Sequence, residues 1–114
     1  MTFDEYEKCA LSTAIYPGKG SSGGLTYVAL KMNGEAGEFA EHLGKAFRDD
    51  GYGDQSLTPE RRELLIKEVG DVLWYLNAAA VELGTSLEEI AKVNVEKLAK
   101  RNAENKIKGS GDNR

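Results

Sequence analysis

The sequence of 114 residues lacks the features that several common protein classes need. Its one cysteine, Cys9, excludes an internal disulfide. Two prolines and few clusters of β-branched residues favour helices over sheet. No apolar run reaches the roughly 18 residues needed to span a membrane, and the acidic start MTFDEYEKCA lacks the apolar core of a signal peptide. We therefore expect a cytoplasmic protein with no membrane partner.

The chain also lacks the basic excess that is typical of nucleic-acid-binding proteins. Its formal net charge is −4 and its sequence pI is about 5.1, so we expect no nucleic-acid partner. The apolar fraction of 40% and the charged fraction of 30% indicate a globular fold with a modest core. We predict a single domain over residues 1–108 and a disordered tail over residues 109–114. A domain of this size gains stability from oligomerisation.

Helical spacing of apolar residues and recognisable start signals predict an all-α fold of four helices. Thr2, Thr58 and Ser86 are the expected N-caps of the first, third and fourth helices. The expected helices cover residues 2–14, 25–48, 58–83 and 86–106. Three glycines inside the second, at positions 34, 37 and 44, each cost about 1 kcal/mol relative to alanine. Close approach of another backbone, or room for a ligand, would explain them.

Two glycine-rich connections lack the spacing of known ligand loops. The stretch YPGKGSSGG contains a Gly-Lys pair, but the pattern G-x-x-x-x-G-K-[ST] is absent and no strand precedes it. It is either a plain connector or a lid beside an active site. The stretch DDGYGDQSLTPE has Gly51 and Gly53 where a calcium loop needs acidic ligands, which excludes an EF-hand.

Two pairs of carboxylates organise the second and third helices. Glu35 and Glu38 lie three residues apart, as do Glu68 and Asp71. Residues at i and i+3 share one helix face. If the two helices are antiparallel neighbours with these faces together, four carboxylates converge, and they then need cations or protons.

The composition of the third helix strengthens the case for a cation or a proton at these carboxylates. From Val69 onward this helix is apolar on most sides and should be largely buried. Burying an unpaired carboxylate is very costly, so Glu68 and Asp71 need a metal, a base or a proton. On a helical wheel Tyr75 follows the same stripe. Trp74 points elsewhere and is expected in the core or in an oligomer interface. His42 is expected as an incidental surface residue or as an outer neighbour of the acids.

A third stripe lies on the fourth helix, where Asn94, Lys97 and Arg101 repeat at 0, +3 and +7. Mg²⁺ prefers carboxylate and water oxygens and is often completed by substrate phosphates. Lys and Arg bind the remaining phosphate oxygens. The three stripes together favour a nucleoside triphosphate or another phosphoanhydride as the substrate.

The segments GEAGE, KEVGDVLWYL and NVEKLAKR resemble the motifs of the MazG-like nucleotide pyrophosphohydrolases. These belong to the all-α NTP pyrophosphatase superfamily, with the dimeric dUTPases and the phosphoribosyl-ATP pyrophosphohydrolases. The family pattern of E-x-x-E, a spacer and E-x-x-D is met by Glu35, Glu38, Glu68 and Asp71. The resemblance covers about residues 25–105.

This resemblance implies a four-helix MazG-like bundle that is completed by oligomerisation, as a homodimer or a dimer of dimers. It implies hydrolysis between the α- and β-phosphates, giving a nucleoside monophosphate and pyrophosphate, with Mg²⁺, or Mn²⁺ as a substitute, held by the four acids. Glu38 or Glu35 would activate the attacking water. The implied substrate-binding residues are Lys31, Tyr75, Asn94, Lys97 and Arg101.

Several alternatives are weighed against this interpretation. Phosphoribosyl-ATP hydrolysis and a dUTPase-like activity are the nearest. A di-iron carboxylate bundle needs Glu-x-x-His pairs on two helices, which the single histidine does not supply. A helical oligomerisation or regulatory module with a vestigial site is the non-enzymatic alternative.

Overall fold

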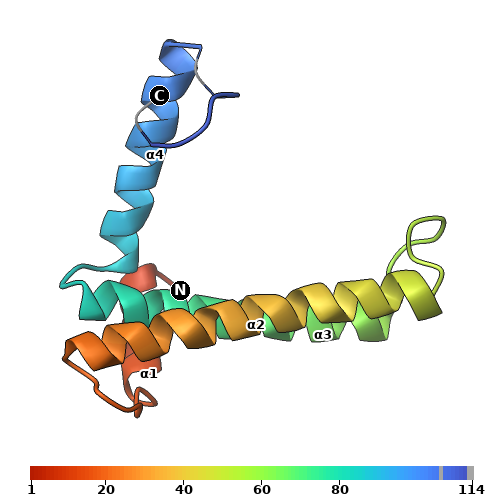
Figure 1. The fold of residues 1–114 in the computed structure, drawn as a ribbon, viewed down its shortest axis with the longest axis horizontal. Coiled ribbons are helices and arrows are strands. Elements are labelled where there is room, and N and C mark those ends of the chain that lie inside the picture. Colours follow the sequence, from red (N-terminus) through yellow and green to blue (C-terminus); the bar gives the residue numbers. More distant parts are fainter. Residues whose placement is uncertain (106, 113–114) are drawn as a thin grey trace.

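The computed structural model describes residues 1–105 and 107–112 and contains four helices in that part of the chain (Figure 1). No strand occurs there beyond an isolated bridge between Tyr52 and Gln55. The helices are α1 (Phe3–Leu11), α2 (Ser22–Asp49), α3 (Pro59–Glu82) and α4 (Leu87–Ala103). The predicted all-α fold is therefore confirmed.

The predicted helix starts are confirmed by their caps. The Thr58 hydroxyl accepts the Arg61 backbone N–H at 3.1 Å, and the Ser86 hydroxyl accepts that of Glu89 at 3.2 Å. Thr2 caps α1 in the same way. Each bond satisfies one of the donors that the first turn of a helix leaves unpaired.

The ends of the helices differ from the prediction by a few residues. Helix α1 stops at Leu11 rather than at residue 14. Ser12 Oγ donates to the Cys9 carbonyl at 2.6 Å, and Thr13 Oγ1 donates to the Ala10 carbonyl at 2.9 Å. Such side-chain bonds compete with continuation of the helix. Helix α2 starts three residues earlier than predicted, and α4 stops at Ala103.

Helices α2 and α3 form a long antiparallel hairpin, and α4 leaves it as a second arm, so the molecule is L-shaped (Figure 1). Helix α1 packs near the corner against α3 and α4. Among the described residues, α4 makes no close backbone approach to α2. The two acidic helices are thus neighbours, as expected, but the four helices do not close into a bundle within one chain.

The corner of the L is built around Gly84, whose φ of +71° lies in the left-handed region that favours glycine. Its N–H donates to the Val81 carbonyl at 3.0 Å, and the Thr85 N–H donates to that of Ala80 at 2.9 Å. These bonds close the last turn of α3 in the manner of a glycine C-cap. Two residues later Ser86 caps α4 in a new direction.

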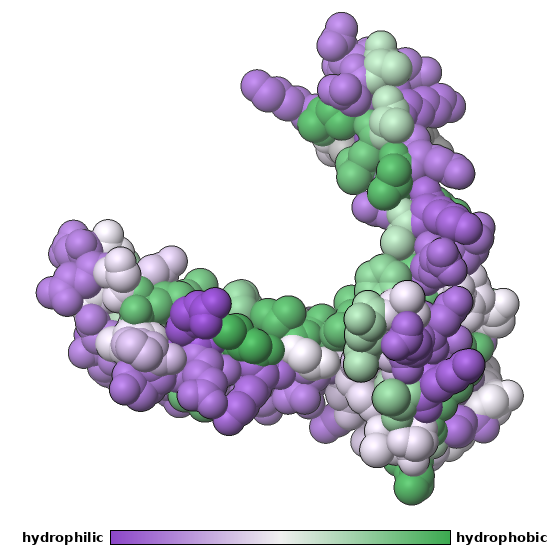
Figure 2. All heavy atoms as spheres, turned by 180° about the vertical axis from the view of Figure 1, so that it is seen from behind, coloured by the Kyte–Doolittle hydropathy of each residue, from purple (hydrophilic) through white to green (hydrophobic). Residues whose placement is uncertain are grey.

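The core of this single chain is thin. Val28, Ala46 and Ala80 are fully enclosed, but the expected burial of α3 is wrong within one chain, where Val69 is 53% exposed and Leu83 is 62% exposed. The radius of gyration is 17.1 Å, compared with about 13 Å for a compact chain of this length. Apolar side chains gather along the inner side of the L, over both arms (Figure 2). No helix in the described ranges has the length and hydrophobicity to cross a membrane.

The connection between α1 and α2 is fastened to the end of α3 by Glu82. This carboxylate accepts a hydrogen bond from the Tyr16 hydroxyl at 2.6 Å and one from the Gly20 N–H at 2.8 Å. Both bonds favour the charged form, and the pKa of Glu82 is lowered, chiefly by the Gly20 N–H and then by Tyr16. The connection is therefore held in one place beside the hairpin.

Glu82→Gln should lower the melting temperature at neutral pH, because a neutral amide accepts these bonds more weakly than a carboxylate. The folded-state pKa of Glu82 lies below its ordinary value of 4.5. Its contribution is therefore present above about pH 4.5 and is lost as the pH falls through the folded-state pKa. Thermal melts of wild type and variant should differ at pH 7 and converge in acid.

The matched control is Glu96→Gln on the exposed surface of α4, which should melt like wild type at both pH values. If the melting temperatures of the wild type and Glu82→Gln differed by the same amount at every pH, the stabilising role of the charged Glu82 carboxylate would be contradicted.

Candidate functional site

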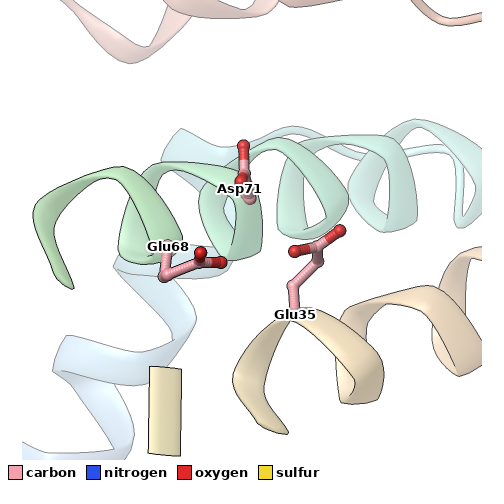
Figure 3. A group of neighbouring side chains, drawn as sticks. All are labelled: Glu35, Glu68 and Asp71. Carbon is pink, nitrogen blue, oxygen red and sulfur yellow. The ribbon is translucent and has the colours of Figure 1, made fainter. Parts of the chain in front are cut away.

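Three carboxylates converge between α2 and α3. One carboxylate oxygen each from Glu35, Glu68 and Asp71 lie within 4.8 Å of one another. Glu35 reaches from α2 toward α3, on which Glu68 and Asp71 lie three residues apart (Figure 3). The i, i+3 spacing on α3 and the antiparallel packing against α2 bring these acids together, as the sequence predicts for three of the four.

Glu68 is one of the two half-buried acids of the group. Its side chain is 13% exposed, and its Oε1 lies 3.3 Å from Nε2 of His42. Its Oε2 is buried and has no hydrogen-bond partner among the described residues. Burial raises the pKa of Glu68, the nearby Glu38 carboxyl raises it further, and His42 opposes the shift. His42 is therefore an outer neighbour of the acids.

Glu35 experiences the same crowding from the other helix. Burial raises its pKa, and repulsion from Glu38, Asp71 and Glu68 adds to the shift, while Lys31 opposes it. Lys31 thus carries a positive charge close to this cluster. Glu38 is exposed and is not one of the three that converge, although it lies near enough to raise the pKa values of Glu35 and Glu68.

A groove of about 400 Å³ opens beside these acids. Its lining comes from α2, α3 and the segment after α1, and consists of Thr13, Ile15, Glu35, Asp71, Trp74 and Tyr75. Tyr75 was predicted here. Trp74 was expected in the core or in an oligomer interface. Within one chain it is half-buried and lines the same groove as Glu35 and Asp71, so it is not a core residue. Its place in an oligomer interface stays a prediction. Thr13 and Ile15 were missed, because the path of the connection after α1 leaves no periodic signal in the sequence.

The rings around this groove form a connected aromatic cluster. Tyr16 stacks on Tyr27 with ring centroids 6.1 Å apart and an interplanar angle of 4°. Trp74 meets Tyr16 edge-on at 6.4 Å and Tyr75 edge-on at 4.9 Å. Such edge-to-face pairs are a favoured aromatic geometry. The cluster joins the Gly-rich connection to the acidic face of the hairpin.

Comparison with known proteins connects this arrangement to a family. Residues 25–105 match the MazG nucleotide pyrophosphohydrolase domain. The chain belongs to the MazG nucleotide pyrophosphohydrolase family. It is also 43% identical, over 117 aligned positions that span all of both chains, to the Gene 37 protein of Mycobacterium phage L5. No solved structure matches the chain.

Membership of the MazG family indicates a nucleotide pyrophosphohydrolase, and the acidic cluster fits the metal dependence typical of that family. All three converging donors are carboxylate oxygens, which suit a hard divalent cation. The buried, unpartnered Oε2 of Glu68 is a donor atom that such a cation would satisfy. Within residues 1–105 and 107–112, Glu35, Glu68 and Asp71 are therefore the group whose oxygens lie close enough together to hold a metal ion.

Lys97 and Arg101, the two cations of α4 that were expected to bind phosphate, contact the C-terminal residues of the single chain and not the acids. The Asp112 carboxylate accepts hydrogen bonds from Lys97 at 2.9 Å and from Arg101 at 2.7 Å. Arg101 also donates to the Gly111 carbonyl at 3.1 Å, while Asn94 is exposed on α4. Residues 113 and 114 of the expected tail lie outside the described residues. The groove beside the acids is lined by α2, α3 and the segment after α1.

Glu68→Gln should raise the melting temperature of the metal-free protein at neutral pH. The substitution removes one of three crowded negative charges while it keeps the shape of the side chain. The same change should abolish the rise in melting temperature that Mg²⁺ causes in the wild type. A ligand stabilises the native state only if it binds there, and the variant lacks one of the three carboxylates proposed to bind the ion. Differential scanning fluorimetry with and without Mg²⁺ measures both effects.

The control for this experiment is Glu41→Gln, which removes an exposed charge that pairs with Lys45 on the same helix as Glu35. Its Mg²⁺ response should match wild type. A Glu68→Gln protein that melts below wild type without metal and is still stabilised by Mg²⁺ would refute the crowding argument.

Proposed function

We propose that the protein is a Mg²⁺-dependent nucleoside triphosphate pyrophosphohydrolase. It would cleave the anhydride between the α- and β-phosphates to give a nucleoside monophosphate and pyrophosphate. The observation that carries the proposal is the convergence of Glu35, Glu68 and Asp71 on one small volume, with a buried carboxylate oxygen left unpaired. The match to the MazG domain over residues 25–105 supports the reaction class.

In this proposal Glu35, Glu38, Glu68 and Asp71 hold the cation. When bound, Mg²⁺ would lower the pKa of a coordinated water and neutralise charge that develops on phosphoryl oxygens. We assign the acceptance of the water's proton to Glu38, because it lies beside the converging acids and is more exposed than Glu35. One of its oxygens could then face a water molecule while the other holds the cation. Tyr75 and Lys31 would contact the substrate from the same side of the hairpin.

Asp71→Asn should abolish turnover and leave the fold intact, because Asp71 is exposed and the amide has the same shape. Loss of one group that stabilises developing charge lowers kcat by about 100- to 1,000-fold in other enzymes. The measurement is pyrophosphate release with Mg²⁺ or Mn²⁺ from a panel of canonical, deoxy and modified triphosphates. The panel includes dUTP and phosphoribosyl-ATP to separate the related activities.

Glu41→Gln again serves as the matched control and should turn over like wild type, with circular dichroism confirming that both variants are helical. Near-normal rates in Asp71→Asn would contradict metal ligation there. No turnover by wild type on any substrate of the panel would favour a non-catalytic helical module.

We further propose that a second copy of the chain covers the inner side of the L. The accessible surface is 8030 Å², about 1,900 Å² more than the roughly 6,100 Å² expected for a compact protein of this mass. A stable interface buries about 800 Å² on each partner, so this excess is sufficient for one. Exposed apolar side chains are frequent on both arms: Leu64, Ile66, Val69 and Leu76 on α3, Leu83 at the C-cap of α3, and Ile90, Val93, Val95 and Leu98 on α4.

The glycines of α2 agree with a partner on the hairpin. An added Cβ at Gly34, Gly37 or Gly44 would meet nothing within 4 Å in the described part of this chain. Close approach of another backbone within the same chain therefore does not explain them. An approaching second copy would, since glycine lets two backbones come near each other.

A second copy would also bring phosphate-binding cations to the acids. Within one chain α4 does not approach α2, so the Lys97 and Arg101 of one copy would serve the acids of the other. Phosphate oxygens would then replace the Asp112 carboxylate on these two side chains. The substrate site is, in this proposal, shared between the two copies.

Mixing two inactive variants tests this arrangement. Asp71→Asn and Lys97→Ala should each be inactive or nearly so alone, yet copies co-expressed with different tags and purified as a mixed oligomer should regain about half of wild-type activity. One of the two shared sites then has both intact residues. Size-exclusion chromatography with light scattering gives the oligomeric state.

If α4 served its own copy, every site in the mixed oligomer would contain one damaged residue and activity would stay at the level of the single variants. A monomeric wild-type protein with full activity would also refute the shared site. The control is a mixed oligomer of Glu41→Gln with wild type, which should show wild-type activity.

A further inference from the structure

The only tryptophan of the chain, Trp74, lies beside the acids. It follows Asp71 by three residues on α3, so their side chains start from neighbouring positions on one helix face. Ring and carboxylate line one groove of about 400 Å³, together with Glu35 and Ile15. This volume falls within the range of about 300–1,000 Å³ that is usual for small-molecule sites.

A chain of hydrogen bonds fixes the plane of this ring. The indole Nε1–H donates to Thr13 Oγ1 at 3.0 Å, and the Thr13 hydroxyl donates its own proton to the Ala10 carbonyl at 2.9 Å. An indole has one N–H donor and no acceptor, and a hydroxyl has one proton. The donors of both groups are therefore used within the protein. Trp74 can therefore contact a ligand through its apolar ring surface, but it has no hydrogen-bond donor left for that ligand.

Two tyrosines pack against the same ring. Tyr75 contacts Trp74 edge-on at 4.9 Å and Tyr16 does so at 6.4 Å. Tyr16 is itself anchored by its 2.6 Å hydrogen bond to Glu82. The ring is thus held by Thr13 and Tyr16 in the connection after α1 and by Tyr75 on α3. A ring held this firmly loses little conformational freedom when a ligand binds to it.

The groove therefore has two chemically different parts. Carboxylates at Glu35 and Asp71 suit a cation carrying phosphates, whereas Trp74 and Ile15 suit a flat apolar group. A nucleotide has this same division between its phosphate chain and its base. We propose that the nucleobase of the substrate stacks on Trp74 and that Thr13 is a positioning residue for this ring. This inference rests on the function proposed above.

The Trp74 N–H already donates to Thr13, and this affects which nucleobases the groove can distinguish. Stacking is tolerant of base identity, because every base has a π-face. A ring that stacks without donating a hydrogen bond distinguishes nucleotides from inorganic polyphosphates but does not distinguish one base from another. We therefore expect the Trp74 contribution to binding to be similar for purine and pyrimidine nucleotides.

Binding measurements without turnover test the proposal. The probes are α,β-methylene analogues of ATP and of a pyrimidine triphosphate, and inorganic tripolyphosphate, each with Mg²⁺, in isothermal titration calorimetry. Trp74→Leu should raise the Kd of both nucleotide analogues by about 5- to 100-fold, the range of one base–aromatic stack. The Kd of tripolyphosphate should stay at the wild-type value, because that ligand has no base.

Two further variants separate stacking from structural damage. Trp74→Phe keeps an aromatic ring and should restore most of the nucleotide affinity. Phe47→Leu changes an exposed aromatic residue at the other end of α2 and should bind all three probes like wild type. In the wild type, both nucleotide analogues should also quench the fluorescence of Trp74, which tripolyphosphate should leave unchanged.

Thr13→Val tests the positioning role. Valine keeps the size of threonine but removes the acceptor, so the ring loses its fixed plane. The KM for nucleotides should rise with kcat unchanged, because stacking contributes equally to ground-state and transition-state binding. The emission spectrum of Trp74 should shift even without ligand.

Equal nucleotide affinities in wild type and Trp74→Leu would overturn the stacking proposal while leaving the hydrolase proposal intact, provided that tripolyphosphate binds with Mg²⁺. If none of the three probes binds the wild type, the proposed function fails, and the stacking proposal fails with it. A Trp74→Leu protein that loses tripolyphosphate binding as strongly as nucleotide binding would show structural damage in place of a base contact.

Discussion

Mutual repulsion of carboxylates between two packed helices is the constraint on which the rest of this structure depends. Glu35, Glu68 and Asp71 are brought within 4.8 Å of one another, and burial together with repulsion raises the pKa values of Glu35 and Glu68. A protein that needed these helices only for packing would gain from apolar side chains at these positions. The hairpin of α2 and α3 therefore holds a destabilising cluster in place, which is typical of a site that binds a cation.

The rest of the chain supports that hairpin from one side. Helix α1 and the connection after it pack at the corner, where Glu82 and Thr13 fasten the aromatic cluster beside the acids. The other side of the hairpin and the inner face of α4 remain apolar and exposed (Figure 2). The three converging acids thus lie where a substrate is expected, and exposed apolar surface lies where a second copy is expected.

The sequence predicted those features that depend on local physics. The caps at Thr58 and Ser86 could be predicted, because the hydroxyl of an N-cap residue accepts a hydrogen bond from the backbone N–H three residues later. The facing pairs on α2 and α3 are readable because the i, i+3 spacing fixes one helix face. The position of Trp74 was not readable, since it depends on where Thr13 and Tyr16 lie after α1 ends. The sequence also did not predict that α4 would lie away from α2. An apolar stripe on a helix shows that the helix packs against something, but it does not show whether the partner is the same chain or another.

The L shape itself depends on the one residue at its corner that lacks a side chain. Gly84 occupies the left-handed conformation, which costs other residues roughly 1–2 kcal/mol. A residue with a Cβ at this position would strain the turn that ends α3, while Ser86 would still cap the start of α4. The angle between the two arms would then be less firmly fixed. The shape of the surface that we propose for a second copy therefore depends on the backbone freedom of one glycine.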